Sequence, residues 1–138
     1  MLDCIFCKII NNEIPCHKVY EDKEVLAFLD INPIVKGHTV VIPKIHVETL
    51  LSLPDEKIKP LFLAIKKITQ QIKNKLNPEA FNIGINMGKK AGQVVDHLHV
   101  HIIPRWQNDG GKSVNSIVNN PPKENLEDIL ERIVGTGL

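Results

Sequence analysis

Histidine alternates with aliphatic residues from position 97 to position 103, in the run His-Leu-His-Val-His-Ile-Ile. Successive side chains of a β-strand point to opposite faces, so this period of two predicts a strand with His97, His99 and His101 on one face. The aliphatic residues between them form the other face, which must be buried in a core. Three of the six histidines of the chain lie in this short run, and the imidazoles are expected to line a cleft.

The spacing of the three imidazoles limits the chemistry that they can share. Same-face residues of a strand are roughly 7 Å apart, so His97 and His101 are separated by roughly 13 Å of backbone. Histidine nitrogens bind zinc at about 2.0–2.1 Å, so one ion cannot hold all three. The spacing instead favours a neutral His99 that acts as nucleophile or base, with neighbours that supply protons and hydrogen bonds to an anionic substrate.

Length and composition indicate an ordinary globular protein. A chain of 138 residues can form one domain over residues 1–138 that buries about two thirds of the surface of its unfolded form. A formal net charge of +1 gives no electrostatic argument for binding to nucleic acid or to a membrane. The amino terminus lacks a basic segment followed by an apolar run, and no stretch of about 18 apolar residues occurs. We therefore expect a cytoplasmic protein.

Two of the three cysteines have a spacing that is typical of a functional pair. Cys4 and Cys7 are separated by two residues, which in a reducing compartment suggests a metal site or a redox pair. Cys16 is most simply a small apolar residue.

Hydrophobic periodicity predicts an α+β fold with a five-stranded antiparallel sheet. Apolar residues recur at steps of three and four up to residue 76, which indicates one long helix with Pro60 in its first turn. The expected elements are a short helix over 4–12, strands over 17–21, 24–30 and 38–43, the long helix from about 57 to 76, and strands over 81–87 and 97–105. Beyond residue 105 the chain is rich in turns, with an amphipathic helix expected over 123–133.

Five motifs together resemble one known family. They are the histidine run, Phe28-Leu29-Asp30-Ile31-Asn32-Pro33, the stretch from His38 to His46, Asn86-Met87-Gly88 and Ala91-Gly92-Gln93. In order and approximate spacing the chain resembles the histidine triad (HIT) family of nucleotide hydrolases and transferases. The resemblance covers residues 3–105 and implies a HIT-like fold with one long helix and a short N-terminal helix, followed by a C-terminal extension over 106–138.

The resemblance also implies catalytic roles for the histidines. The middle histidine of the family attacks the α-phosphorus of a nucleotide, so His99 is expected to form a nucleotidyl-imidazole that water then hydrolyses. Attack requires a neutral ring whose other nitrogen keeps its proton and donates a hydrogen bond to an acceptor, usually a backbone carbonyl. We expect His101 and His97 to assist, and His38 to lie just behind the triad.

The expected nucleotide site has three parts. The phosphate should be held by the backbone of Gly92-Gln93-Val94 and by the side chains of His101, Gln93 and Asn86. The resemblance places Asp30 on the ribose. The base pocket is expected to be walled by Phe6, Ile9, Phe28 and Ile31. Gly92-Gln93 could instead be an ordinary turn, and Ile9 and Phe28 could equally be plain core. The chain has no phosphate-binding loop and no acidic pair suited to magnesium, so we expect no magnesium in the chemical step.

Some family members bind zinc, and here the corresponding residues are Cys4, Cys7, His46 and His97. Two thiolates and two imidazoles would close a tetrahedral site, so the ion would be structural. As a zinc ligand, His97 could not also relay protons. The alternative is that the two cysteines are small buried residues without a metal.

One departure from the family pattern bears on the substrate. Hint-type members carry a hydroxyl residue after the Gly-Gln pair, whereas this chain has Val94, which cannot donate a proton. Dinucleoside polyphosphates therefore stand beside phosphoramidates as expected substrates, with release of a purine nucleoside monophosphate. The alternative function is a zinc-stabilised nucleotide sensor or interaction module with little turnover. The resemblance also implies a homodimer.

Overall fold

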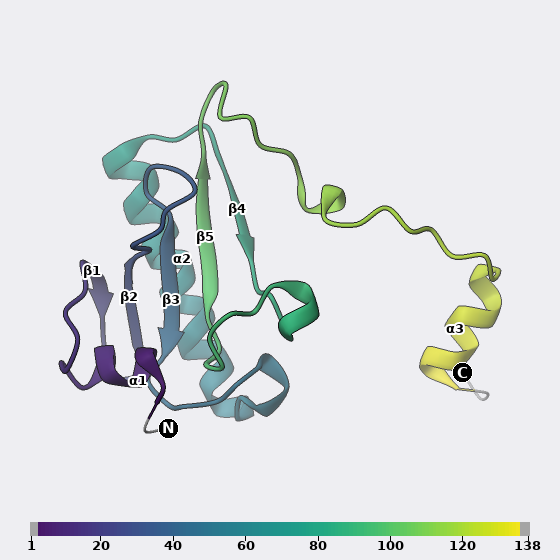
Figure 1. The fold of residues 1–138 in the computed structure, drawn as a ribbon, viewed down its shortest axis with the longest axis horizontal. Coiled ribbons are helices and arrows are strands. Elements are labelled where there is room, and N and C mark those ends of the chain that lie inside the picture. Colours follow the sequence, from purple (N-terminus) through teal and green to yellow (C-terminus); the bar gives the residue numbers. More distant parts are fainter. Residues whose placement is uncertain (1–2, 136–138) are drawn as a thin grey trace.

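The structure, a computed structural model, describes residues 3–135 and contains a five-stranded antiparallel sheet in the order β1-β2-β3-β5-β4 (Figure 1). This confirms the predicted α+β fold. The strands are β1 (Lys18–Glu21), β2 (Val25–Leu29), β3 (Thr39–Pro43), β4 (Ala80–Gly84) and β5 (Val100–Arg105). The α-helices are α1 (Ile5–Ile10), α2 (Ile58–Leu76) and α3 (Leu126–Val134).

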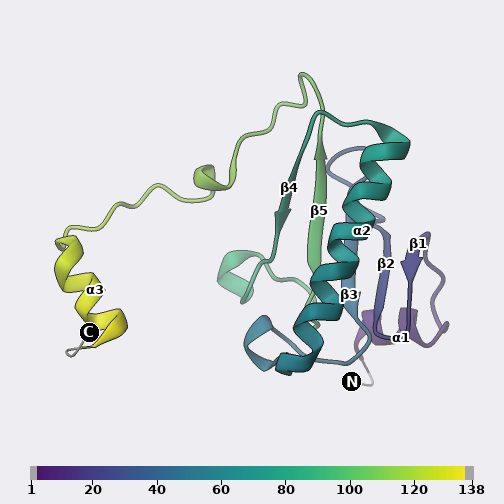
Figure 2. The ribbon, with the colours of Figure 1, turned by 180° about the vertical axis from the view of Figure 1, so that it is seen from behind.

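The long helix α2 covers one face of the sheet (Figure 2). Its buried stripe includes Leu61, Ile65 and Ile68, which pack against the inward side chains of β2, β3 and β5. Pro60 lies in the first turn, where its missing N–H removes no helical hydrogen bond. Asn77 ends the helix in the left-handed conformation with φ 56°.

The short helix α1 covers the opposite face of the sheet. Phe6 and Ile9 of α1 pack on Phe28 and the other outward apolar residues of β2 and β3. The rings of Phe6 and Phe28 meet edge to face at 5.6 Å. Cys4 caps the helix, since its sulfur accepts a hydrogen bond from the backbone N–H of Cys7. The sheet therefore has one face covered by α2 and one covered by α1, which we call the α2 face and the α1 face.

The largest differences from the predicted strand bounds are at the start of β5 and at the end of β4. β5 begins only at Val100, because β3 ends at Pro43, which has no N–H for the ladder, and Leu98 donates instead to the carbonyl of Val47. β4 ends at Gly84, which pairs with His101, so Asn86 lies in the following loop. Within residues 3–135 no helix is long and apolar enough to cross a membrane.

The α2 face provides a test of the packing. Leu61 is fully buried on α2, whereas Leu63 is 45% exposed on the same helix. We expect Leu61→Ala to lower the free energy of unfolding by about 2–5 kcal/mol, because it leaves a cavity in the core. Leu63→Ala should cost less than about 1 kcal/mol in urea denaturation. Equal losses for the two variants would contradict the described packing.

Candidate functional site

His99 has one ring nitrogen occupied and the other free. Its Nδ1 donates a hydrogen bond of 2.7 Å to the carbonyl oxygen of His97, which leaves the lone pair on Nε2. The ring is 5% exposed and meets Phe6 edge to face at 5.2 Å. This carbonyl is the acceptor that the sequence argument required for a nucleophilic imidazole.

His101 is linked to His38 by a short chain of hydrogen bonds. The backbone N–H of Ile34 donates to His38 Nδ1 at 3.3 Å, so the proton of a neutral His38 lies on Nε2. That Nε2 donates to His101 Nδ1 at 2.9 Å, which places the proton of a neutral His101 on its own Nε2. His101 therefore has an N–H available as a donor.

Burial keeps both of these imidazoles neutral. Burial, with smaller contributions from His99 and His38, lowers the pKa of His101 to about 4. Burial also lowers the pKa of His38, and the Asp30 carboxylate, 3.6 Å from His38 Nε2, acts in the opposite direction. At neutral pH the pair is therefore uncharged and serves as a hydrogen-bond relay.

A cavity of about 260 Å³ opens beside the triad between α1 and the sheet. Eight residues expected at the nucleotide site line it, namely Phe6, Ile9, Phe28, Asp30, Ile31, Val94, His99 and His101. Further lining comes from Ile14, Pro15, Cys16 and Val95, which the sequence did not point to because the first three precede a strand and resemble an ordinary turn. The cavity is mainly apolar, and its polar lining consists chiefly of the Asp30 carboxylate, the Asn32 side chain and the two imidazoles.

Three expected phosphate-site residues do not line this cavity, namely Asn86, Gly92 and Gln93. The Gln93 side chain is 6% exposed and holds its own loop together: Oε1 accepts from the backbone of Gly88, and Nε2 donates to the carbonyls of Glu48 and Val95. Gly92 has φ 104°, a conformation that favours glycine. The loop thereby presents Val94, which is 88% exposed, at the cavity mouth.

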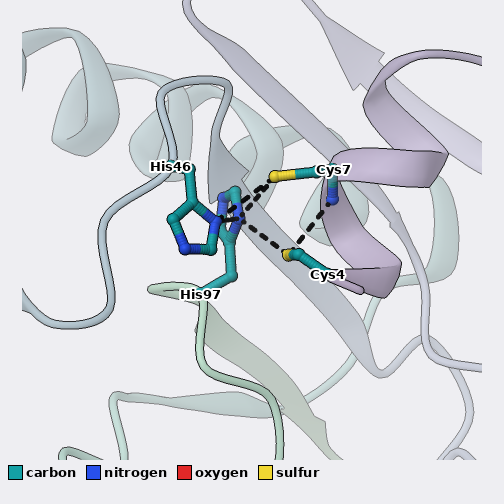
Figure 3. Close-up of side chains that lie close together, drawn as sticks. All are labelled: Cys4, Cys7, His46 and His97. Carbon is teal, nitrogen blue, oxygen red and sulfur yellow. Dashed lines mark hydrogen bonds between the residues drawn. The ribbon is translucent and has the colours of Figure 1, made fainter. Parts of the chain in front are cut away.

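A second cluster brings together the four side chains that the sequence suggested for zinc (Figure 3). Cys7 Sγ lies 3.3 Å from His46 Nδ1 and 3.6 Å from His97 Nδ1. Cys4 Sγ lies 3.4 Å from His97 Nδ1, and the two Nδ1 atoms are 3.2 Å apart. Helix α1, the loop after β3 and the segment before β5 each contribute to the cluster.

The distances between the four ligand atoms fit tetrahedral coordination of one metal ion. Zinc with bonds of about 2.1 Å to nitrogen and about 2.3 Å to sulfur holds its ligand atoms roughly 3.4–3.8 Å apart, close to the distances found. His97 Nε2 donates to the carbonyl of Pro43 at 2.9 Å, which leaves Nδ1 free to bind the metal. Burial and the neighbouring Cys4 thiol raise the pKa of Cys7 to about 11. A metal would therefore displace protons from the thiols when it binds.

Comparison with known proteins identifies the family. Residues 11–108 match the model of the HIT domain. The chain belongs to the histidine triad (HIT) family. A HIT-like protein of Methanocaldococcus jannaschii is 48% identical over 132 residues, which cover 96% of this chain and 99% of the relative. An adenosine 5'-monophosphoramidase of Schizosaccharomyces pombe is 44% identical and covers 82% of each chain.

Solved structures of HIT proteins have the same fold. The crystal structure of a HIT family protein from Bacillus subtilis matches with a TM-score of 0.85 at 43% identity, over 99% of this chain and 98% of that chain. A zinc-bound histidine triad protein from Mycobacterium smegmatis matches with a TM-score of 0.74 at 37% identity, over 79% of each chain.

The neutral state of His101 can be measured by NMR. We expect its ring to protonate with a midpoint near pH 4, whereas the same residue in the urea-unfolded chain should titrate near pH 6.5. Because the folded pKa is the lower one, this group makes the protein less stable as the pH falls from about 6.5 to about 4. A folded midpoint at or above 6.5 would contradict the role of burial.

Proposed function

We propose that this HIT protein is an enzyme that cleaves nucleotide conjugates at the α-phosphorus through a covalent nucleotidyl-His99. The observation that carries the proposal is the hydrogen bond from His99 Nδ1 to the His97 carbonyl, beside an apolar cavity that also contains the Asp30 carboxylate. A binding module needs no nucleophile held in its reactive tautomer. Relatives named adenosine 5'-monophosphoramidase and adenylylsulfatase support the reaction class.

The reaction proceeds in two displacements. His99 Nε2 attacks the α-phosphorus, a P–N bond forms, and the bond from phosphorus to the leaving group breaks. Water then attacks the same phosphorus and releases one proton to the solvent, the P–N bond breaks, and a nucleoside monophosphate leaves with His99 again neutral. The Nε2–H of His101 donates to the phosphoryl oxygens and stabilises their charge in both transition states. His38 acts through His101, which it holds in the required tautomer.

The lining of the cavity supports the remaining nucleotide contacts that we propose. Asp30 binds the ribose hydroxyls, and the apolar walls around Phe6, Ile9, Phe28 and Ile31 hold a purine base. The phosphate contacts proposed for the Gly92-Gln93-Val94 backbone fall on Val94, the residue of this turn that lines the cavity. No group in this set requires magnesium for the chemical step.

The exposed Val94 leaves the choice of leaving group open. A valine cannot protonate an amine, so the departing group must take its proton from water or leave as an anion. Phosphoramidates and dinucleoside polyphosphates are both candidate substrates. They differ in the charge of the group that leaves.

We also propose that the Cys4, Cys7, His46 and His97 cluster holds a structural zinc ion. The four side chains would hold the ion with no open position for water, and the bound ion would tie α1 to the segment that carries the triad. The ligand-atom distances and the zinc-bound M. smegmatis relative support this proposal. His97 is then a ligand and contributes to catalysis through its backbone carbonyl.

The covalent step is tested by His99→Ala, because alanine offers no nucleophile. We expect rapid mixing of the native protein with an adenosine phosphoramidate or a diadenosine polyphosphate to give an adduct of AMP mass by denaturing mass spectrometry. His99→Ala should abolish the adduct and slow turnover by at least about a thousandfold, with AMP affinity largely retained. The matched control is His17→Ala, at an exposed histidine outside the cavity.

The results of these experiments distinguish a covalent enzyme from a nucleotide-binding module. Turnover that survives His99→Ala would overturn the mechanism. No adduct and no AMP release from either substrate with the native protein would favour a nucleotide-binding module.

The zinc proposal predicts a difference between two cysteines. Cys7→Ser should remove about one zinc per chain in elemental analysis and lower the melting temperature by roughly 10 °C, as expected for a loss of about 3 kcal/mol. Cys16→Ser, outside the cluster, should keep the metal. Equal zinc content in both variants would contradict the assignment.

A further inference from the structure

Cys4 and Cys7 are two free thiols at the start of α1, and both point toward the imidazoles of the cluster (Figure 3). The backbone N–H of Cys7 donates to Cys4 Sγ at 3.3 Å. All ligand atoms of the cluster lie within 4.8 Å of one another, so the two sulfur atoms are close neighbours. A sulfur–sulfur bond of about 2.05 Å can form when these two short side chains rotate toward each other.

The two thiols differ in their access from outside. An open cavity of about 710 Å³ is lined by Cys4 but not by Cys7. A small solute that enters this cavity therefore meets the Cys4 sulfur first. The cavity is also lined by the carboxylates of Asp3, Glu48 and Asp96. Their negative charge repels an anionic oxidant, whereas neutral hydrogen peroxide enters without a charge penalty.

His97 connects these thiols with His99. The His97 Nδ1 lies 3.4 Å from Cys4 Sγ and 3.6 Å from Cys7 Sγ, and the His97 carbonyl accepts the 2.7 Å hydrogen bond from His99 Nδ1. A disulfide between the two cysteines would remove both thiolate ligands from the cluster. His46 and His97 alone do not complete a tetrahedral structural site, so the metal would be released and the His97 ring would lose a constraint.

We propose that Cys4 and Cys7 form a redox switch, in which hydrogen peroxide joins them in a disulfide, zinc is released and the hydrogen bond that orients His99 is weakened. The inference rests on the proposed zinc site and adds a modification site to it. Cys4 is the thiol that hydrogen peroxide attacks, and Cys7 completes the disulfide.

The oxidation consumes one molecule of hydrogen peroxide for each disulfide. The Cys4 thiolate attacks one peroxide oxygen, the O–O bond breaks, hydroxide leaves, and Cys4 becomes a sulfenic acid. The Cys7 thiolate then attacks the Cys4 sulfur, the S–S bond forms and a second hydroxide leaves. The two thiolates lose two electrons in total, and the two hydroxide ions take up two protons from the solvent to give water. A dithiol reductant reverses the reaction by thiol–disulfide exchange.

The disulfide and the metal can be measured together on the full chain loaded with zinc. After treatment with hydrogen peroxide, we expect a mass lower by two hydrogen atoms, a Cys4–Cys7 link in peptide mapping, and one zinc per disulfide bound by a chromogenic chelator. Dithiothreitol with added zinc should restore the starting state. Cys16→Ser should give the same results, because Cys16 lies outside the cluster.

Several results of this experiment would overturn the proposal. They are a disulfide that includes Cys16, a link between two copies, zinc release without a disulfide, and intact thiols with bound zinc after the treatment. A reduced chain that contains no zinc would refute both the proposed zinc site and the release step.

Two matched variants test which thiol is attacked. Cys7→Asp and Cys4→Asp each replace one thiolate by a carboxylate, which can also bind zinc. In Cys7→Asp, hydrogen peroxide should produce a sulfenic acid at Cys4 that dimedone traps. In Cys4→Asp, the Cys7 thiol should react at least about tenfold more slowly, because it does not line the open cavity. Equal rates in the two variants would contradict the assignment of Cys4.

The connection to the nucleophile has a readout that needs no turnover. The ring of His99 is 5% exposed, and its Nδ1–H is bonded to the His97 carbonyl. In protein with ¹⁵N-labelled histidine, we expect the disulfide to speed exchange of this proton with solvent at least about tenfold. Release of AMP from an adenosine phosphoramidate should slow by at least about tenfold in the same sample.

The two readouts separate the switch from the proposed function. A reduced protein that releases no AMP from any nucleotide conjugate would refute the proposed function, while the exchange rate of the His99 proton would still decide the switch. A disulfide that changes neither the exchange rate nor the turnover of an active protein would overturn the switch and leave the proposed function standing.

Discussion

The site depends on the burial of Leu98, Val100 and Ile102 against α2. Because side chains alternate along an extended chain, fixing these three on the α2 face forces the three histidines between them onto the α1 face. On the α1 face each of the three histidines has different neighbours. His97 joins the two thiols of the α1 helix, His99 and His101 open on the cavity, and His101 also bonds to His38. One apolar stripe thus orients every imidazole of the triad.

His97 connects the candidate metal site with the candidate nucleophile. Its ring lies in the Cys-His cluster, while its backbone carbonyl accepts a hydrogen bond from the Nδ1–H of His99. Any constraint on the His97 ring is therefore transmitted to the orientation of His99. A structural ion in the cluster would rigidify the nucleophile without contacting the substrate.

The sequence predicted the sheet, the long helix and the two faces of the histidine segment, because each follows from a local period. The residues at which the strands begin and end were predicted less accurately. The start of β5 depends on Pro43 and Val47, which are distant in sequence and interrupt the ladder. Gln93 was expected at the phosphate, but its side chain bonds to Glu48, Gly88 and Val95, and a local pattern cannot reveal such partners. The Cys-His set required the family resemblance, since His46 belongs to no periodic pattern.

The covalent intermediate is the central claim, and the configuration at phosphorus tests it most directly. A nucleotide conjugate with a chiral α-phosphorothioate is hydrolysed in ¹⁸O-labelled water, and the configuration of the released nucleoside phosphorothioate is determined. Two in-line displacements, the first by His99 Nε2 and the second by water, predict overall retention of configuration. Inversion would mean that water attacks the phosphorus directly and would contradict the account.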